Sequence, residues 1–119
     1  MARLSIRVDL DGEGRLGPGK VALLERIEAH GSIAAAGRSM AMSYKRAWEL
    51  VAEINDSFRE PLVHPKPGGL RGGGATLTPL GRELVGRYRA IEREAAEAVS
   101  RHLRALDAAA GVGGERSSR

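Results

Sequence analysis

The residues with the most useful chemistry lie together in the segment Ser-Tyr-Lys-Arg-Ala-Trp-Glu, which runs from Ser43 to Glu49. The guanidinium group of Arg46 can donate two parallel hydrogen bonds to the edge of a guanine base, a contact that contributes roughly 1–3 kcal/mol of discrimination. The ammonium group of Lys45 suits a phosphate, and the hydroxyl groups of Ser43 and Tyr44 can reach a phosphate or a base. Together with Glu49, which also points outward in the predicted helix, this segment predicts a contact with a nucleic acid.

Basic residues are concentrated in two windows, 29–48 and 61–82, that contain no aspartate or glutamate. The formal net charge of the whole chain is only +4, so the basic surface is confined to these segments. Lysine and arginine contacts to phosphates release counterions and so favour association with polyanions. A generally basic proteome is the alternative explanation of the same distribution.

The first elements of the chain are a predicted strand and a predicted helix. From residue 4 to residue 10, apolar side chains alternate with polar ones, as in a half-buried strand. Three glycines between residues 12 and 17 interrupt this pattern, and we interpret them as a turn that joins the strand to the helix. Pro18 suits the first turn of that helix and Gly31 suits its end.

A second and a third helix follow at the spacing of a helix-turn-helix. Ser32 is the predicted N-cap of a short helix over 33–40, and Ser43 is the predicted N-cap of the next one. Only residues 40–42 connect them, which is typical of a pair whose second helix enters a major groove. In the helix that begins at Ser43, apolar residues recur at helical spacing at Ala47, Val51, Ile54 and Phe58. The first three are predicted to form its inward side.

The predicted helix that begins at Ser43 carries two aromatic residues near its start, Tyr44 and Trp48. Trp48, the single tryptophan of the chain, is expected to pack between the helices, because a lone tryptophan is more often structural. The alternative is that its indole lies against a sugar-phosphate backbone. Tyr44 is expected to be up to half buried.

A glycine-rich hairpin is predicted after the third helix. Residues 62–63 and 75–77 are predicted to be short strands, and the segment between them is too rich in glycine and proline to be helical. Lys66 and Arg71 bring basic charge to this loop, for contact with a phosphate or with a minor groove. Together with Ser32 they are the predicted anchors on the nucleic-acid backbone.

A long amphipathic helix is predicted to begin at Thr78 and Pro79. Its apolar positions recur in steps of three and four as far as Leu106. A helix of that length cannot bury its apolar side on so small a body, so we expect it to pair with a second copy of the chain; a solitary amphipathic helix is the alternative. The predicted dimer contacts are Leu84, Tyr88, Ile91, Ala95, Val99 and Leu106. After this helix, residues 111–119 lack periodicity and are predicted to be a disordered tail.

Two glycine patterns imitate nucleotide-binding motifs without meeting their other requirements. The pattern Gly12-x-Gly14-x-x-Gly17 is followed by two helices in place of a parallel strand, and no acidic residue lies about 20 positions further on. The pattern from Gly14 to Lys20 is followed by a valine in place of the hydroxyl residue that a Mg²⁺ ion needs. We therefore interpret both as parts of the turn.

No catalytic site, metal site or cofactor is predicted, and we do not expect an enzyme. The chain has no cysteine, its three histidines lack the spacing of metal ligands, and no carboxylate pair lies in an apolar setting. No apolar run approaches the roughly 18–20 residues of a membrane span, and the amino terminus does not resemble a signal peptide. We expect a protein of the reducing cytoplasm that is associated with the nucleoid and has no membrane partner.

Two sequence stretches resemble a known family. They are Ser-Tyr-Lys-x-Ala-Trp at 43–48 and Gly-Gly-x-x-Gly-Gly-Gly-Ala-x-Leu-Thr at 68–78. The chain resembles, over about residues 4–106, the N-terminal DNA-binding domain of the molybdate-responsive regulators of ModE type, and more distantly that of LysR-type regulators. The resemblance implies a dimer held by the strand and the long helix, a palindromic operator, and control of molybdenum-uptake and molybdoenzyme genes. Full-length members carry their oxyanion site in separate C-terminal β-barrels, which this sequence does not contain, so we do not expect this chain to bind molybdate.

The prediction as a whole is a mainly α, α+β protein. Residues 1–110 form one winged helix-turn-helix domain, which binds double-stranded DNA specifically as a homodimer and regulates transcription. One alternative is a winged-helix module that binds other proteins, which the basic segment argues against. The other is an oxyanion-binding protein that uses arginine-rich surfaces or helix N-termini, for which no convergent cluster of donors is visible.

Overall fold

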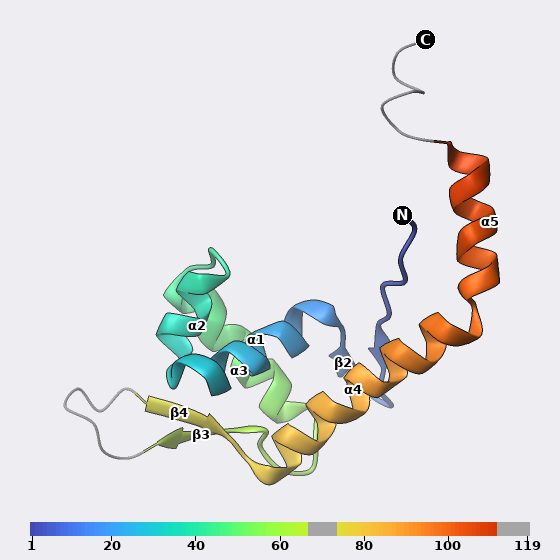
Figure 1. The fold of residues 1–119 in the computed structure, drawn as a ribbon. Coiled ribbons are helices and arrows are strands. Elements are labelled where there is room, and N and C mark those ends of the chain that lie inside the picture. The colour runs from blue at the N-terminus through green and yellow to red at the C-terminus, as the bar shows by residue number, and fades with distance from the viewer. Residues whose placement is uncertain (67–73, 112–119) are drawn as a thin grey trace.

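The computed structural model describes residues 1–66 and 74–111, and it shows a mostly helical α+β architecture with two small antiparallel sheets in that part of the chain. Three helices pack together beside a hairpin, and a long helical arm runs away from them (Figure 1). The elements in chain order are β1 (Val8–Asp9), β2 (Arg15–Leu16), α1 (Pro18–His30), α2 (Ile33–Ser39), α3 (Tyr44–Asp56), β3 (Val63–Lys66), β4 (Gly74–Leu77), α4 (Pro79–Ala98) and α5 (Ser100–Ala110).

The N-terminal segment has the predicted alternation, but only a small part of it is a strand. Side chains from residue 2 to residue 10 are in turn half-buried and exposed. Only β1 pairs, with Val8 opposite Leu16 of β2. The sequence analysis missed β2 because a two-residue strand within a glycine-rich segment has no detectable period. The predicted turn is therefore the end of a hairpin, where Gly12 adopts a φ of 87°.

The first three helices begin and end close to the predicted residues. Gly31 ends α1 in the left-handed conformation, with a φ of 75°. The hydroxyl oxygen of Ser32 accepts a hydrogen bond of 3.0 Å from the backbone N–H group of Ala35. In the same way, the hydroxyl oxygen of Ser43 accepts one of 3.0 Å from Arg46. These two caps confirm the predicted starts of α2 and α3.

The connection between α2 and α3 is tight. Helix α2 ends at Ser39, one residue earlier than predicted, because Ala41 takes a left-handed conformation with a φ of 57°. The carbonyl group of Gly37 accepts hydrogen bonds of 3.0 Å from the N–H groups of both Met40 and Met42. A β-carbon added to Gly37 would lie only 2.8 Å from the Cβ atom of Ala47, so the two helices approach as closely as their side chains allow.

The core lies where α1, α2, α3, the β3–β4 hairpin and the start of α4 meet. The hairpin is attached to the helices by backbone, since the N–H group of Ala75 donates to the carbonyl of Gly31 at 2.8 Å. The predicted inward side of α3, Ala47, Val51 and Ile54, is buried, whereas Phe58 lies beyond the end of the helix at Asp56 and is half-buried. The buried leucine and isoleucine residues of this core outside α3 are Leu23, Leu24, Ile27, Ile33, Leu62, Leu77 and Leu80.

Helix α4 begins directly against the start of β3. The hydroxyl group of Thr78 accepts a hydrogen bond of 2.9 Å from the N–H group of Gly81 and donates one of 2.9 Å to the carbonyl of Pro61. A β-carbon at Gly81 would lie 2.3 Å from the carbonyl oxygen of Leu62. The absence of a side chain at Gly81 therefore allows α4 to lie on the strand.

The long helix predicted from Leu80 to Leu106 is interrupted at Val99. That residue has φ −109° and ψ 10°, and it separates α4 from α5, which turns away from the α4 axis (Figure 1). Valine and serine are both weak helix formers, and they are adjacent at this point. The N-terminus adds a tie at the far side of the bend, because the backbone N–H group of Ala2 donates to Asp107 at 2.6 Å.

Tyr88 has a different place from the predicted one. Its predicted place is the dimer contact, but its side chain is 1% exposed and packs against Leu16 and Val21 of the same chain. Its hydroxyl group donates a hydrogen bond to the carbonyl of Ile6, and burial raises the pKa of the phenol. The ring is thus used to hold the N-terminal hairpin on α4, and it is unavailable to a second copy.

Candidate nucleic-acid interface

The exposed surface of α3 has three parts, which follow from its buried side. Ala47, Val51 and Ile54 face the core. Lys45 and Glu49 therefore point straight outward, since they lie about half a turn from that side. Tyr44 and Trp48 form one flank, which faces the β3–β4 hairpin, and we call it the aromatic flank. Arg46, Leu50 and Glu53 form the other, which faces the β1–β2 hairpin, and we call it the charged flank.

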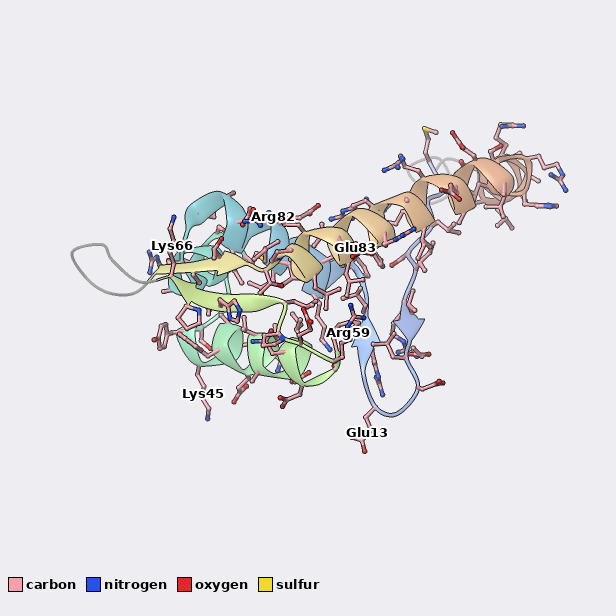
Figure 2. The ribbon with its side chains drawn as sticks, turned by 90° about the horizontal axis from the view of Figure 1, so that it is seen from below. Glu13, Lys45, Arg59, Lys66, Arg82 and Glu83 are labelled. Atoms are coloured by element: carbon pink, nitrogen blue, oxygen red, sulfur yellow. The ribbon has the colours of Figure 1, made fainter. Side chains whose placement is uncertain are left out.

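The outward part carries the most exposed cation of α3. The side chain of Lys45 is 85% exposed, and its ammonium nitrogen lies 4.0 Å from the carboxylate of Glu49. A surface pair of this length at i,i+4 contributes only a few tenths of a kcal/mol, so it leaves Lys45 free to exchange partners. Figure 2 shows Lys45 pointing away from the body of the protein.

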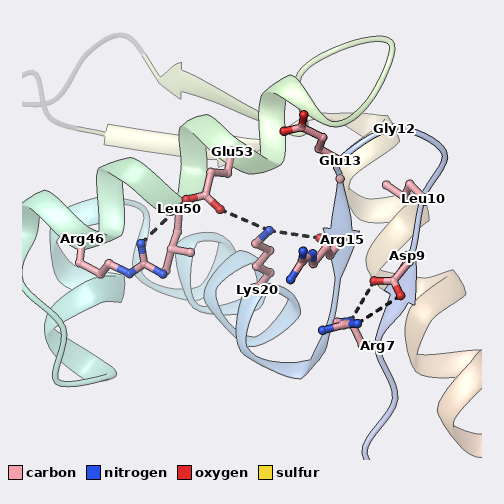
Figure 3. Close-up of a pocket in the computed structure, with 11 residues that line it drawn as sticks. Arg7, Asp9, Leu10, Gly12, Glu13, Arg15, Lys20, Arg46, Leu50 and Glu53 are labelled. Carbon is pink, nitrogen blue, oxygen red and sulfur yellow. Dashed lines mark hydrogen bonds and ion pairs between the residues drawn. The ribbon is translucent and has the colours of Figure 1, made fainter.

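The charged flank holds Arg46 between two carboxylates. Its guanidinium group lies 3.7 Å from Glu49 and 3.8 Å from Glu53. Glu53 also lies 3.5 Å from the ammonium group of Lys20, which donates a further hydrogen bond of 3.2 Å to the carbonyl of Arg15 in β2 (Figure 3). Arg46 is therefore connected through α1 to the N-terminal hairpin. These groups line an open groove of about 670 Å³.

Glu53 and Lys20 were not predicted to be neighbours of Arg46. The spacing of Glu49 and Glu53, three and seven residues after Arg46, places both on one side of a helix and was an available signal. No comparable signal exists for Lys20, because it comes from α1 and its proximity depends on how the two helices pack. Its side chain is only 18% exposed.

The aromatic flank corrects the prediction for Trp48. Trp48 is 45% exposed, so it does not lie between the helices, whereas Tyr44, at 64% exposed, is within the expected range of partial burial. The two rings meet edge to face, with centroids 6.0 Å apart. The reason is the close contact between Gly37 and Ala47, which leaves no space between α2 and α3 for an indole.

An apolar cleft of about 280 Å³ lies between the aromatic flank and the β3–β4 hairpin. Asn55 braces this cleft: its side-chain oxygen accepts from the N–H groups of Leu62 and Val63, at 2.8 and 3.1 Å, and its amide donates to the carbonyl of Val63. The sequence analysis missed this role of Asn55. The described residues that line the cleft are Ile33, Trp48, Val51, Asn55, Val63, Pro65, Gly74 and Ala75.

The predicted backbone anchors are only partly described. Lys66 ends β3 opposite Gly74 and is exposed, at the end of the molecule remote from α5 (Figure 2). Strand β3 therefore includes Pro65 and Lys66, which the sequence analysis placed in the loop. Ser32 is half-buried, with its hydroxyl oxygen used as the cap of α2. Arg71 lies outside the described residues, as do residues 112–119 of the predicted tail.

Arg82, which belongs to the second basic window, has a structural partner. Its guanidinium group lies 2.6 Å from the carboxylate of Glu28, which also accepts a hydrogen bond of 3.2 Å from the N–H group of Leu77. The hydrogen bond from Arg82 lowers the pKa of Glu28. These contacts hold β4 and α4 on α1, and the exposed face of α3 is not involved.

The arm formed by α4 and α5 exposes apolar side chains. Ile91 is 43% exposed and Leu106 is 62% exposed, while Ala95 and Val99 are half-buried. Leu84 is half-buried against the core of its own chain. Within residues 1–66 and 74–111, no helix is long and apolar enough to cross a membrane, and no three histidine or acidic side chains come together as metal ligands.

Comparisons with known proteins relate the chain to two kinds of protein, transcriptional regulators and molybdenum-pterin-binding proteins. It is 44% identical over 93 residues to the molybdenum-pterin-binding protein MopB of Rhodobacter capsulatus, which covers 78% of this chain and 34% of MopB. It is 42% identical over 101 residues to the molybdenum transport protein ModE of Azotobacter vinelandii, which covers 85% of this chain and 37% of that protein. It is 38% identical over 71 residues to the DNA-binding transcriptional dual regulator ModE of Escherichia coli K12, or 60% of this chain and 27% of the regulator.

These similarities cover only part of each relative. No family model matches the chain. The chain spans about a third of the length of MopB and of the Azotobacter ModE protein. None of the three names is that of an enzyme, and two of the three proteins are named ModE.

Proposed function

We propose that this chain is a winged helix-turn-helix regulator of ModE type that binds double-stranded DNA through α3. The observation that carries the proposal is the exposed start of α3, where Lys45, Arg46 and the hydroxyl groups of Ser43 and Tyr44 lie on an accessible surface. The similarity to a regulator that is itself named DNA-binding supports the same conclusion. In this proposal α2 and α3 are the helix-turn-helix and the β3–β4 hairpin is the wing.

The proposed roles follow from where each group lies. Arg46 leaves its carboxylate partners to donate two hydrogen bonds to a guanine, and Glu49 then accepts from a neighbouring base such as cytosine. Lys45 contacts a phosphate. The hydroxyl group of Ser43 already accepts a hydrogen bond within α3, and it retains a hydrogen to donate to a phosphate.

Anchoring to the DNA backbone is assigned to the hairpin side of the interface. Lys66 extends from β3 toward a phosphate or a minor groove, and Arg71 is proposed to do the same from the loop. Ser32 lies beside the point where Ala75 bonds to the α1–α2 turn, so it is placed to contact the same phosphate path.

The proposed dimer uses the exposed apolar side of the helical arm. Ile91, Ala95, Val99 and Leu106 supply this contact, with Leu84 at its edge. A two-fold arrangement would present two copies of α3 to a palindromic site. Leu106→Glu is expected to shift the protein from dimer to monomer in sedimentation velocity; a variant that remains a dimer at micromolar concentration contradicts this placement.

The proposed regulatory targets are molybdenum-related genes, and we propose that this part of the chain does not itself bind molybdate. Support for the second statement comes from the groove beside α3. Three of the four cations that line it lie close to carboxylates, since Arg7 lies 2.8 Å from Asp9, and both Lys20 and Arg46 lie within 4 Å of Glu53. An anion would have to displace these carboxylates.

Selection from a pool of random duplexes tests the proposal directly. The purified protein is expected to enrich a two-fold symmetric sequence and to bind it with an affinity that falls steeply with salt, since each phosphate contact contributes about −0.9 to the slope. The affinity is expected to be the same with and without molybdate. Failure to enrich any sequence, with binding that is indifferent to salt, would indicate a protein-interaction module.

A further inference from the structure

Trp48 is 45% exposed, because the close approach of α2 and α3 keeps its indole on the surface of α3. Large aromatic side chains usually lie in a core or an interface, and an exposed aromatic cluster marks a contact surface more often than an accident of packing. Here the indole packs edge to face against the exposed ring of Tyr44, which lies one helical turn earlier. The aromatic flank therefore has the properties of a binding surface on the side of α3 that faces the hairpin.

The cleft next to Trp48 fits an apolar group carried by a polyanion. None of the described residues that line it is charged, and the one polar side chain, Asn55, already bonds to the backbone of the hairpin. Lys45 is exposed on the adjacent outward part of α3, and Lys66 is exposed at the end of β3. The apolar surface can contact an apolar group of the partner, and the two lysines beside it can contact phosphates on either side of that group.

In the major groove of DNA, the apolar group of this kind is the C5 methyl group of thymine. We propose that Trp48 is a specificity-determining residue that contacts a thymine methyl group when α3 lies in the major groove. This inference rests on the proposed DNA-binding function. It adds a base contact made by an apolar residue to the polar contacts assigned to Arg46.

The contact is tested by removing the methyl group alone. Each thymine of the selected site is replaced in turn by uracil, which pairs identically with adenine. The wild-type protein is expected to lose about fourfold in affinity at one thymine in each half-site, the fold-change that corresponds to the burial of one methyl group. In Trp48→Ala the ratio of the two affinities at that position is expected to fall to about one.

Two variants separate this effect from a general loss of binding. Lys45→Ala, from the neighbouring outward position, is expected to weaken binding to both duplexes while it retains the fourfold ratio. Trp48→Phe keeps an aromatic ring at the same place and is expected to keep part of the ratio. Both positions are on the surface, so we expect the fold to be unchanged in either variant.

The indole also supplies its own signal, because Trp48 is the single tryptophan of the chain. The selected duplex is expected to protect its fluorescence from acrylamide quenching at least twofold, and the duplex with uracil at the critical position is expected to protect it less. An indole that remains equally quenchable on the selected duplex overturns the contact.

The possible failures are distinguishable. If a sequence is enriched but wild type and Trp48→Ala show the same ratio at every thymine, or if the enriched site has no thymine, the inference about Trp48 is wrong and the proposed function stands. If no sequence is enriched at all, the proposed function fails and this inference fails with it.

Discussion

The contact between α4 and the start of β3 depends on a glycine, which makes Gly81→Ala a demanding test of the structure. The new β-carbon would lie 2.3 Å from the carbonyl oxygen of Leu62 and 3.2 Å from its carbonyl carbon. Ordinary contacts need about 3.5 Å, so α4 and the strand would have to separate by roughly 1 Å. The oxygen cannot simply turn aside, because it accepts a hydrogen bond of 2.9 Å from the N–H group of Thr78.

The expected magnitude follows from two opposing effects. Overpacking against a backbone atom costs about 3 kcal/mol, at the upper end of its usual range. Alanine in place of glycine within a helix recovers about 1 kcal/mol. The net loss in the free energy of unfolding is therefore about 2 kcal/mol, which corresponds to a melting temperature lower by roughly 10 °C for a domain of this size.

Gly86→Ala is the matched control, because it makes the same change in the same helix. A β-carbon there would have no atom within 4 Å, so only the helical preference of alanine acts. That variant is expected to gain about 0.5–1 kcal/mol. Urea denaturation of both variants at one protein concentration measures the two effects. If Gly81→Ala is as stable as wild type, the close approach of α4 to Leu62 is wrong, and with it the placement of the hairpin beside α3.

Replacing Ala41 by glycine is expected to raise the free energy of unfolding by about 0.5–1 kcal/mol, because a φ of 57° is strained for alanine and not for glycine; a denaturation curve without any gain would count against this turn. The pKa of Glu28 is lower in the folded chain than its ordinary value of 4.5, so the unfolded chain binds more protons as the pH falls below that value and stability declines. Glu28→Gln is expected to flatten this decline between pH 6 and pH 3, and equal slopes would contradict it. Lys66→Ala is expected to lower the salt slope of DNA binding by about one without a change in sequence preference, whereas an unchanged slope would mean that Lys66 contacts no phosphate. Arg46→Ala is expected to weaken binding to the selected site roughly 10- to 100-fold and to relax one base pair, while Glu53→Gln is expected to strengthen binding to random duplexes; an equal loss on selected and random DNA would argue against a base contact.

The features that could be predicted from the sequence are those with a local cause. The caps at Ser32 and Ser43 and the end of α1 at Gly31 each depend on a few neighbouring residues. The buried side of α3 and the alternation of residues 4–10 depend on a period that the chain displays directly. These features are sufficient to place the exposed segment from Ser43 to Glu49 at the start of a helix.

The features that were missed depend on how closely different elements pack against one another. Trp48 was expected to be internal, and it is excluded because Gly37 and Ala47 bring α2 and α3 too close together. Tyr88 was expected to face a second copy, but the N-terminal hairpin returns to cover it. The periodicity of the sequence predicts neither the separation of α2 and α3 nor the position of the N-terminal hairpin over Tyr88.

The break at Val99 was missed for another reason. The apolar period continues through it without a shift, so the pattern alone describes a single helix. Two weak helix formers in succession are a small signal, and the tie between Ala2 and Asp107 is a contact between the two ends of the described chain. The bend therefore coincides with a weak local signal, the two poor helix formers, and with a tertiary contact, the hydrogen bond between Ala2 and Asp107.

The carboxylates of Glu49 and Glu53, which lie within 4 Å of the basic groups of α3, also bear on how quickly a target can be found. If α3 contacts DNA as proposed, every phosphate that Lys45 or Arg46 meets on random sequence competes with an internal partner. Residence on each wrong site is shortened, and more sites are sampled per second while the protein slides and hops. At the correct site, hydrogen bonds to the base edges compensate for the loss of these internal ion pairs. Glu49 and Glu53 thus lower the affinity of α3 for random DNA and shorten the time needed to find the target.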